Sequence, residues 1–387
     1  MKIVAFTSIR SDYDLVSGVY KLLNNDPTID LKLIVSGAHL TEKFGKTINH
    51  VINDGFSYFS LETLIEGDSY SSRIKTASIL LQGSIDYVRN IAPDLLIITG
   101  DREDVIVGGM IGLYLNIPVI HFFGGDHEQD GHADTYIRHA TSKLATVHFV
   151  ATMEHQQRLI ALGESKKRIF NIGSVSLDKF KKHIPLTYAE LKETFPKEKK
   201  LENFALVIYH PVNEEVDYVE EYFEQILISL KKLGFAGIVS YPNSDPGYEK
   251  IIKIIDKYQG DSNFLFYKNF DRDYFLTIFK HAKFIIGNSS AGIYEAASIP
   301  IPAINVGLRQ KGRFCGENVI FVDNDKELIE NAIKVVNTEE FRKRISTMSN
   351  PYGDGNSELK AYNLIKAINF HTLLPKIEDP LEAFYEK

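Results

Sequence analysis

The sequence predicts an α/β protein built from two Rossmann-like domains with a ligand cleft between them. Short apolar runs alternate with longer amphipathic runs along most of the 387 residues, and this alternation is typical of a parallel sheet covered by helices on both faces. The length fits two domains of ordinary size. The alternation is interrupted once, at residues 179–202, and then restarts.

The apolar runs of the first half indicate a Rossmann-like domain. The run at 94–99 is apolar on both faces, as expected for a buried parallel strand, and the helix at 11–24 places its leucines and a valine near one face. The expected elements are strands at 3–6, 31–35, 94–99, 118–122, 147–150 and 169–172, and helices at 11–24, 71–91 and about 103–116.

The second half repeats the pattern. Asn324 is the expected N-cap of the helix at 325–336, with Glu327 three residues on to complete a capping box. The expected elements are strands at 205–209, 237–241, 263–266, 284–287, 303–306 and 319–322, and helices at 214–233, 271–281, 325–336 and 357–371.

The lysine-rich interruption at 179–202 favours a solvated helix and connector over a polybasic binding site. We therefore expect an N-terminal domain at 1–178 and a C-terminal domain at 179–365. The tail at 366–387 would then be free to pack back on the first domain.

Composition excludes several functional classes. The net charge of −7 argues against a general nucleic-acid binder, which usually has a basic face. Cys315 is the single cysteine, so no intrachain disulfide forms and nothing indicates an oxidising compartment. The N-terminal apolar run is too short for a signal peptide, and no uncharged run approaches the ~18 residues of a membrane helix. We expect a cytoplasmic protein without a membrane segment.

Polar residues follow the predicted strands, where ligands bind to open parallel sheets. Gly287–Gly292 reads Gly-Asn-Ser-Ser-Ala-Gly at a strand-to-helix turn, a pattern suited to an anion at a helix N-terminus. Glu295 lies farther along that expected helix, within reach of a ribose hydroxyl. A capped helix start without a ligand is the alternative. The basic loop Arg309–Arg313 adds weight to a phosphate site, whereas His210 fits a core histidine and a cleft histidine equally well.

Three other patterns are weaker. No Gly-x-x-x-x-Gly-Lys-Ser/Thr loop is present, which argues against a P-loop NTPase. Gly108-Gly109-Met110-Ile111-Gly112 lies inside a helical stretch and favours close packing of helix on sheet over a dinucleotide loop. Asp126–His132 begins like a calcium loop, but its twelfth position is Ile137 rather than Glu. Its histidines and acids do not have the spacing of known zinc ligands, so we favour a polar active-site loop. We expect neither a metal nor a cofactor.

Taken together, these segments resemble the UDP-N-acetylglucosamine 2-epimerases, in particular the hydrolysing branch that supplies N-acetylmannosamine for sialic acid synthesis. The resemblance spans nearly the whole chain and implies the two-domain glycosyltransferase-B fold. It rests on the order and spacing of Thr7–Tyr13, Gly100–Arg102, His121–Asp126, Ile137–Ala140, Tyr209–Pro211, Gly287–Gly292 and Gly307–Arg313.

The resemblance implies a mechanism and a site. A base removes the proton at C2 of the sugar, UDP leaves from C1, and water adds to the resulting acetamidoglucal with a proton returning to the other face of C2. The implied catalytic set is Asp101, Asp126, Asp134 and His210, without individual acid and base roles. The implied UDP-binding set is Arg10, Arg102, Asn243, Ser289, Ser290, Glu295 and Arg313, with Glu295 on the ribose and the serines on phosphate.

Two departures from the family pattern bear on the sugar. Asp126 stands where relatives usually carry Glu, in a loop about two residues longer, so that Asp126 or Glu128 is repositioned or the sugar pocket differs. Phe123 stands where relatives often carry Glu or His. An apolar side chain there would suit a 4-acetamido-6-deoxy sugar, as in the related enzymes of legionaminic acid synthesis.

Four functions remain distinct expectations. The first is a hydrolysing 2-epimerase of UDP-N-acetylglucosamine, with the UDP-N,N'-diacetylbacillosamine enzyme as its variant. A non-hydrolysing epimerase would give an equilibrium of two UDP-sugars, and a glycosyltransferase would need an acceptor. A non-enzymatic nucleotide-sugar binder would have no need for the acidic set. The resemblance also suggests a homodimer or homotetramer, and GDP in place of UDP stays open.

Overall fold

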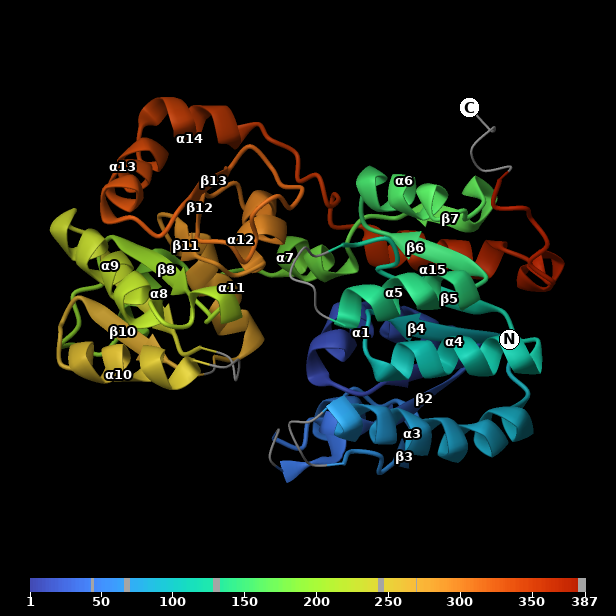
Figure 1. The fold of residues 1–387 in the computed structure, drawn as a ribbon. Coiled ribbons are helices and arrows are strands. Elements are labelled where there is room, and N and C mark those ends of the chain that lie inside the picture. Colours follow the sequence, from blue (N-terminus) through green and yellow to red (C-terminus); the bar gives the residue numbers. More distant parts are fainter. Residues whose placement is uncertain (43–44, 66–69, 128–132, 243–246, 269, 382–387) are drawn as a thin grey trace. The chain divides into compact units, whose positions relative to one another are not determined.

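The computed structural model describes all residues except 43–44, 66–69, 128–132, 243–246, 269 and 382–387. The chain divides into two compact units, one formed by Met1–Asp178 with Gly355–Lys387 and the other by Lys179–Asp354 (Figure 1). Residues 355–365, which the sequence pattern assigned to the second domain, therefore belong to the N-terminal unit.

In its described residues the N-terminal unit holds a seven-stranded parallel sheet with the strand order β3-β2-β1-β4-β5-β6-β7. Its strands are β1 (Lys2–Thr7), β2 (Asp30–Ser36), β3 (Ser57–Leu61), β4 (Leu95–Thr99), β5 (Val119–Phe122), β6 (Val147–Val150) and β7 (Ile169–Asn171). Its helices are α1 (Arg10–Asn24), α2 (Ile48–Asn53), α3 (Tyr70–Ile91), α4 (Glu103–Leu115), α5 (Ala133–Leu144), α6 (Met153–Ala161) and α15 (Ser357–Ala367).

Strand β1 shows why this sheet is covered on both sides. Side chains alternate between the two faces of a strand, so Ile3 and Ala5 pack with residues of α1 and α15 in one core cluster. Val4 and Phe6 point the other way and pack with residues of α3 and α4 in a second cluster. All four side chains are fully or almost fully buried, as expected for a parallel strand between two helical layers.

The glycines of α4 let this helix approach the sheet closely. A Cβ added at Gly108 would lie 2.5 Å from Ile98 Cγ2, and one at Gly112 would lie 2.1 Å from Val119 Cγ2. Such distances are far inside van der Waals contact, so only glycine fits at these positions. The predicted packing role of the Gly108–Gly112 segment is confirmed.

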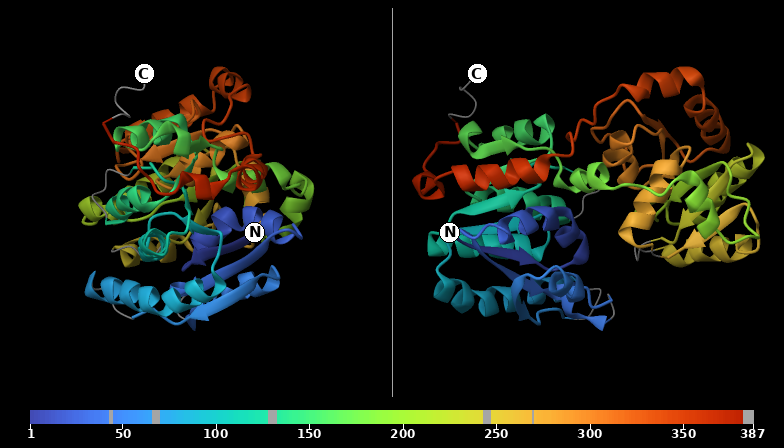
Figure 2. Two further views of the ribbon diagram at one scale, coloured as in Figure 1. Left: turned by 90° about the vertical axis from the view of Figure 1, so that its right-hand side faces the viewer. Right: turned by 180° about the vertical axis from the view of Figure 1, so that it is seen from behind.

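The chain returns to the N-terminal unit through α15 and the segment after it, drawn in red (Figure 2). Asp178 accepts hydrogen bonds from the backbone N–H groups of Ser357 and Glu358, at 3.0 and 2.9 Å, and so caps the start of α15. Farther on, Arg168 donates two hydrogen bonds to the carboxylate of Glu378, at 2.9 and 2.8 Å. The last described residues are thus attached to this unit by a forked ion pair.

The described residues of the C-terminal unit form a six-stranded parallel sheet with the strand order β10-β9-β8-β11-β12-β13. Its strands are β8 (Phe204–Ile208), β9 (Ala236–Ser240), β10 (Phe264–Tyr267), β11 (Ile285–Gly287), β12 (Ala303–Val306) and β13 (Val319–Val322). Its helices are α7 (Asp178–Lys182), which starts at the unit boundary, α8 (Tyr188–Thr194), α9 (Val219–Lys232), α10 (Tyr248–Tyr258), α11 (Arg272–His281), α12 (Ala291–Tyr294), α13 (Lys326–Val336) and α14 (Glu339–Ser346).

Central strand β8 again feeds two cores. Ala205 and Val207 pack with residues of α9, α10 and α13, whereas Phe204 and Leu206 pack with residues of α8 and α11. The chain is therefore an α/β protein with two parallel-sheet domains, as the alternation of apolar runs predicted. Within the described part of the chain, no helix combines the length and apolar character that crossing a membrane requires.

Candidate functional site

The turn after β4 presents Asp101 at the carboxyl edge of the N-terminal sheet. Gly100 has φ +89°, a left-handed conformation that suits glycine, and a Cβ built there would lie 3.8 Å from the Asp12 carboxylate. Burial lowers the pKa of His121 to about 3, so its ring is neutral and its Nε2–H donates to the Gly100 carbonyl at 2.8 Å. A hydrogen bond from a buried histidine thus holds the turn that presents Asp101.

Arg138 of α5 connects two of the predicted acids. Its side chain is only 7% exposed; it forms an ion pair with Asp101 and lies 3.6 Å from Asp126 Oδ2. The other oxygen of Asp126 lies 3.3 Å from His155 Nε2 of α6. One guanidinium therefore joins the ends of β4 and β5.

Asp134 lies one turn earlier on α5 and has a different cation. Arg73 of α3 donates to Asp134 Oδ1 at 2.8 Å and also forms an ion pair with Glu103 at the start of α4. Asp134 and Arg138 are four residues apart and therefore share one face of α5. The structure thus pairs Asp101 and Asp126 with one guanidinium and Asp134 with another, and α5 carries both Asp134 and Arg138. We refer to these acids and arginines together as the acidic network.

Two further carboxyl groups lie at the same edge. Asp12 is in the first turn of α1 and its side chain is 14% exposed, with Oδ2 at 3.9 Å from Arg102 Nε. Asp104 is buried and accepts a hydrogen bond from Ser8 Oγ at 2.7 Å. Burial raises the pKa of Asp12 to about 6 and that of Asp104 to about 7. These are the values of groups that exchange protons near neutral pH.

Arg10 and Arg102, the two arginines of the predicted UDP-binding set in the N-terminal unit, contact different carboxylates. Arg102 is partly exposed beside Asp12. Arg10 lies on the exposed side of α1, where its Nε is 3.2 Å from Asp14 Oδ2. The structure therefore brings Arg102, but not Arg10, to the acidic cluster.

Phe123 and Gly125 form a strained turn after β5. Phe123 has φ +64°, which is unusual for a residue with a side chain, and its ring is half-buried against the apolar core of the unit. A Cβ at Gly125 would lie 2.3 Å from the His155 carbonyl oxygen, so glycine is required there. This turn therefore sets the position of Asp126 in the loop after β5.

In the C-terminal unit, the side chain of Asn288 joins the loop after β11 to the loop after β8. Its Oδ1 accepts the backbone N–H of His210 at 2.8 Å, and its Nδ2 donates to the His210 carbonyl at 2.8 Å. Asn288 is fully buried. Gly287 before it has φ +135°, and an added Cβ would lie 2.0 Å from the Ile208 carbonyl oxygen. His210 is therefore held through its backbone at the carboxyl ends of β8 and β11.

The serine turn and the basic loop also meet. Arg309 Nη1 and Gln310 Nε2 both donate to the Asn288 carbonyl, at 3.2 and 3.3 Å. Arg313 donates to Gln310 Oε1 at 2.8 Å, and its guanidinium lies 5.2 Å from the ring centre of Tyr294. The cation of Arg313 is thus fixed over the short helix that follows the serine turn.

The helix after Ser289 and Ser290 is shorter than the sequence indicated. α12 is only four residues long, and Glu295 is its C-cap, followed by the 3-10 turn Ala296–Ser298. Ser289 Oγ accepts the backbone N–H of Ala291 at 3.2 Å. The expectation of a longer helix with Glu295 inside it is wrong. Asn243 lies outside the described residues.

The histidines near the Asp126 loop do not assemble a metal centre in the described part of the chain. His127 Nδ1 lies 3.2 Å from His139 Nε2, and the two rings stack. Within the described residues, no group of three or more His, Cys, Asp or Glu side chains has the geometry to hold a metal ion. Glu128 and Asp130 lie outside those residues.

Comparison with known proteins now identifies the family. The model of the UDP-N-acetylglucosamine 2-epimerase family matches residues 21–366. The chain belongs to this family.

Two relatives and one solved structure illustrate the range of this epimerase family. The chain is 34% identical over 374 residues to the UDP-N,N'-diacetylbacillosamine 2-epimerase (hydrolyzing) of Legionella pneumophila, covering 96% of this chain and 97% of that one. It is 33% identical to a UDP-N-acetylglucosamine 2-epimerase of Neisseria meningitidis, covering 86% of each. A crystal structure of UDP-GlcNAc 2-epimerase from Neisseria meningitidis bound to UDP-GlcNAc has a TM-score of 0.78 at 18% identity, covering 95% of this chain and all of that one.

Some residues around the acidic network of this family member are not predictable from the sequence. Arg73 and His155 come from α3 and α6, and no local pattern relates them to Asp134 and Asp126, which they contact. Asp104 comes from α4 and is buried beside Ser8. Asp12 has a signal in the sequence, because it follows the first strand within Arg10-Ser11-Asp12, although the family resemblance implies no role for it.

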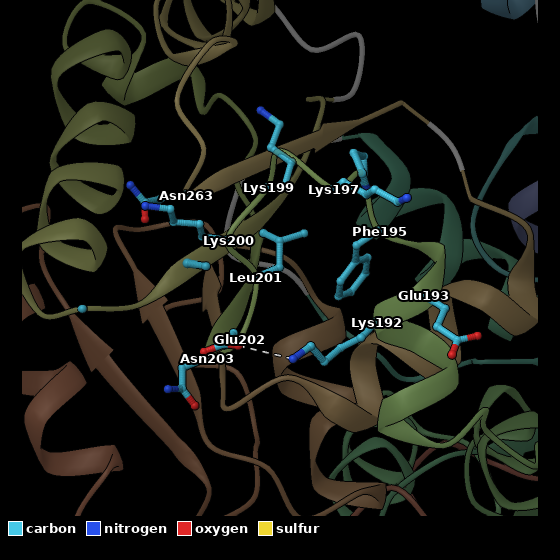
Figure 3. A pocket seen from close by; sticks show the side chains of 13 residues that line it. Lys192, Glu193, Phe195, Lys197, Lys199, Lys200, Leu201, Glu202, Asn203 and Asn263 are labelled. Atoms are coloured by element: carbon cyan, nitrogen blue, oxygen red, sulfur yellow. Dashed lines mark hydrogen bonds and ion pairs between the residues drawn. The ribbon is translucent and has the colours of Figure 1, made fainter.

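The C-terminal unit also has a cavity of about 780 Å³, whose lining side chains are drawn in Figure 3. It is lined by Asn203, Ala236 and Asn263, which stand at the amino ends of β8, β9 and β10. Two of its lysines bind groups of the protein itself: Lys199 donates to two backbone carbonyls at 3.1 and 3.0 Å, and Lys192 pairs with Glu202. Ligands of open parallel sheets bind at the opposite, carboxyl edge.

Proposed function

We propose that the chain is a hydrolysing 2-epimerase that converts UDP-N-acetylglucosamine and water into N-acetylmannosamine and UDP. The observation that carries this proposal is the network of Asp101, Asp126 and Asp134 around two buried or half-buried arginines at the carboxyl edge of the N-terminal sheet. A glycosyltransferase that only transfers a sugar breaks no C–H bond at C2 and so has no need for a set of carboxylates that move protons there.

The chemistry needs bases and acids on the sugar. The proton at C2 is weakly acidic, so its removal requires a positioned carboxylate, and departure of UDP requires cations and N–H donors on the diphosphate. In our proposal the N-terminal network acts on C1 and C2. The C-terminal loops with His210, Ser289, Ser290 and Arg313 bind UDP, and Glu295 binds its ribose.

The sugar itself has a second candidate. UDP-N,N'-diacetylbacillosamine is favoured by the hydrolysing relative at 34% identity over nearly the whole chain. The relative of Neisseria meningitidis at 33% identity supports UDP-N-acetylglucosamine equally well. Phe123 does not decide between them, because its ring packs against the core of the unit.

The test is a reaction in heavy-oxygen, deuterated water with each UDP-sugar in turn. The proposal expects UDP together with a free 2-epimeric sugar that carries the oxygen label at C1 and deuterium at C2. An equilibrium of two intact UDP-sugars would instead establish a non-hydrolysing epimerase. No turnover of either donor without an added acceptor would exclude both epimerase activities and favour a transferase. The donor that turns over with the higher kcat/KM identifies the sugar.

A further inference from the structure

Asp12 lies inside the acidic network although the family resemblance assigned it no role. It sits in the first turn of α1, and its side chain is 14% exposed. Its carboxyl group lies 3.8 Å from where a Cβ at Gly100 would stand, so it lies against the turn that presents Asp101. Its charge interacts with those of Asp134 and Arg138. Asp12 therefore shares one site with the predicted catalytic acids.

One oxygen of Asp12 has no hydrogen-bond partner. Oδ1 accepts from Ser11 Oγ at 3.2 Å, but Oδ2 is buried and no donor among the described residues hydrogen-bonds to it. Arg102 Nε, at 3.9 Å, is too far away for a hydrogen bond. By contrast, Asp101 and Asp134 each receive a guanidinium N–H. A buried oxygen of this kind calls for a proton of its own or a donor on the ligand.

The groups around Asp12 favour its protonated form over a hydrogen bond from a donor on the ligand. Asp104 lies close enough to repel the ionised form of Asp12, and two buried carboxyl groups in one site do not ionise together easily. Burial raises the pKa of Asp12 to about 6. The groups that face Asp12 are Arg102 and Arg138, which favour its ionised form, and Asp134, Asp104 and the phenol of Tyr20, which do not.

We propose that Asp12 is the acid that protonates the sugar after UDP has left. This inference rests on the proposed hydrolysing function. In the glucal intermediate the ring oxygen makes C2 electron-rich, so C2 takes the proton and C1 takes the water. The Asp12 Oδ2–H bond breaks, the C1=C2 electron pair forms the new C2–H bond, and the water oxygen bonds to C1. The water then gives a proton to the Asp12 carboxylate, which restores the acid.

The test separates the two halves of the reaction. UDP release is measured with the UDP-sugar, and hydration is measured with synthetic 2-acetamidoglucal and UDP. For Asp12→Asn we expect UDP release within about threefold of the wild-type rate, glucal accumulating in solution, and hydration slowed at least about 100-fold, the range of general acid catalysis. Asp30→Asn, an exposed carboxylate at the start of β2, is the matched control and should change neither rate.

The outcomes are distinguishable. Hydration of the glucal by Asp12→Asn at the wild-type rate would overturn the role of Asp12 while leaving the proposed function intact. A wild-type protein that releases neither UDP nor free sugar would overturn the proposed function and this inference with it.

A second measurement does not depend on folding of the variant. Since the acid form is lost as pH rises through about 6, wild-type hydration should fall about tenfold per pH unit above that value. A flat profile between pH 5 and 8 contradicts the proposal.

Discussion

Lys376 ties the described end of the chain to a buried carboxylate, and its replacement by methionine should destabilise the N-terminal unit. Glu164 is 0% exposed; its two oxygens contact Lys143 at 2.6 Å, His148 at 3.0 Å, and Lys376. Lys376 also donates to the backbone carbonyls of Lys143 and Ala145 at the C-terminal end of α5, at 3.2 and 3.1 Å. The same helix carries Asp134 and Arg138.

The magnitude follows from the pKa of Glu164. Burial alone would raise that pKa, but the contact with His148, the charge of Lys376 and the hydrogen bond from Lys143 lower it from 4.5 to about 2. This difference corresponds to roughly 3 kcal/mol for the whole set of partners. Because the pKa is lowered, the stabilisation is present above pH 4.5 and is lost as pH falls toward 2. Lys143 remains in the variant, so we expect a loss of about 2 kcal/mol at pH 7 rather than the 3–5 kcal/mol of a fully broken buried pair.

Thermal unfolding at pH 7 measures this loss. For a unit of roughly 200 residues, about 2 kcal/mol lowers Tm by about 5 °C. The control is Lys46→Met, which removes an exposed i,i+4 pair with Glu42 and should shift Tm by less than about 1 °C. If Lys376→Met unfolds at the same temperature as Lys46→Met, Lys376 does not stabilise the buried Glu164 carboxylate.

Three further predictions concern the proposed site. Asp101→Asn should abolish UDP release while UDP affinity by calorimetry stays within about threefold, since Asp101 belongs to the sugar side; undiminished turnover would remove it from the chemistry. Arg313→Ala should weaken UDP binding about tenfold or more, the range for one charged hydrogen bond, and unchanged affinity would exclude Arg313 from the site. Burial raises the pKa of Asp104 from 3.8 to about 7. The folded protein therefore loses stability as the pH rises from about 4 to about 7, because Asp104 stays protonated in the folded state but ionises in the unfolded state. Asp104→Asn should therefore gain a few kcal/mol over the wild type at pH 8 and little below pH 4, measured by urea unfolding at both pH values.

Buried strands were predictable because burial on both faces leaves an unbroken apolar run. β4 has all five residues buried, and the sequence placed it within one residue. β3 was missed for the opposite reason. It is an edge strand whose five residues are all exposed or only partly buried, so Ser57–Leu61 has no apolar pattern that separates it from a loop.

Local capping was predicted less well. The N-cap of α13 is Asp325, whose carboxylate accepts the N–H of Leu328 at 2.9 Å, and the expectation of Asn324 is wrong. Asn324 instead donates to Glu215 at 2.6 Å. Both residue types cap helices well, so only the contact with Glu215, which is distant in sequence, decides between them.

The carboxylates of the site could be placed from sequence, but their protonation could not. Strand-end position indicates Asp101 and Asp126 as residues of the sheet edge, and the family resemblance adds Asp134, four residues before Arg138. Whether each acid carries a proton depends on which cation reaches it. Arg138 and Arg73 reach Asp101 and Asp134, while Asp12 faces Arg102 only at 3.9 Å. A site that ion-pairs some acids and leaves another without a hydrogen-bond donor separates bases from acids, which is what the proposed elimination across C1 and C2 and the hydration that follows it demand.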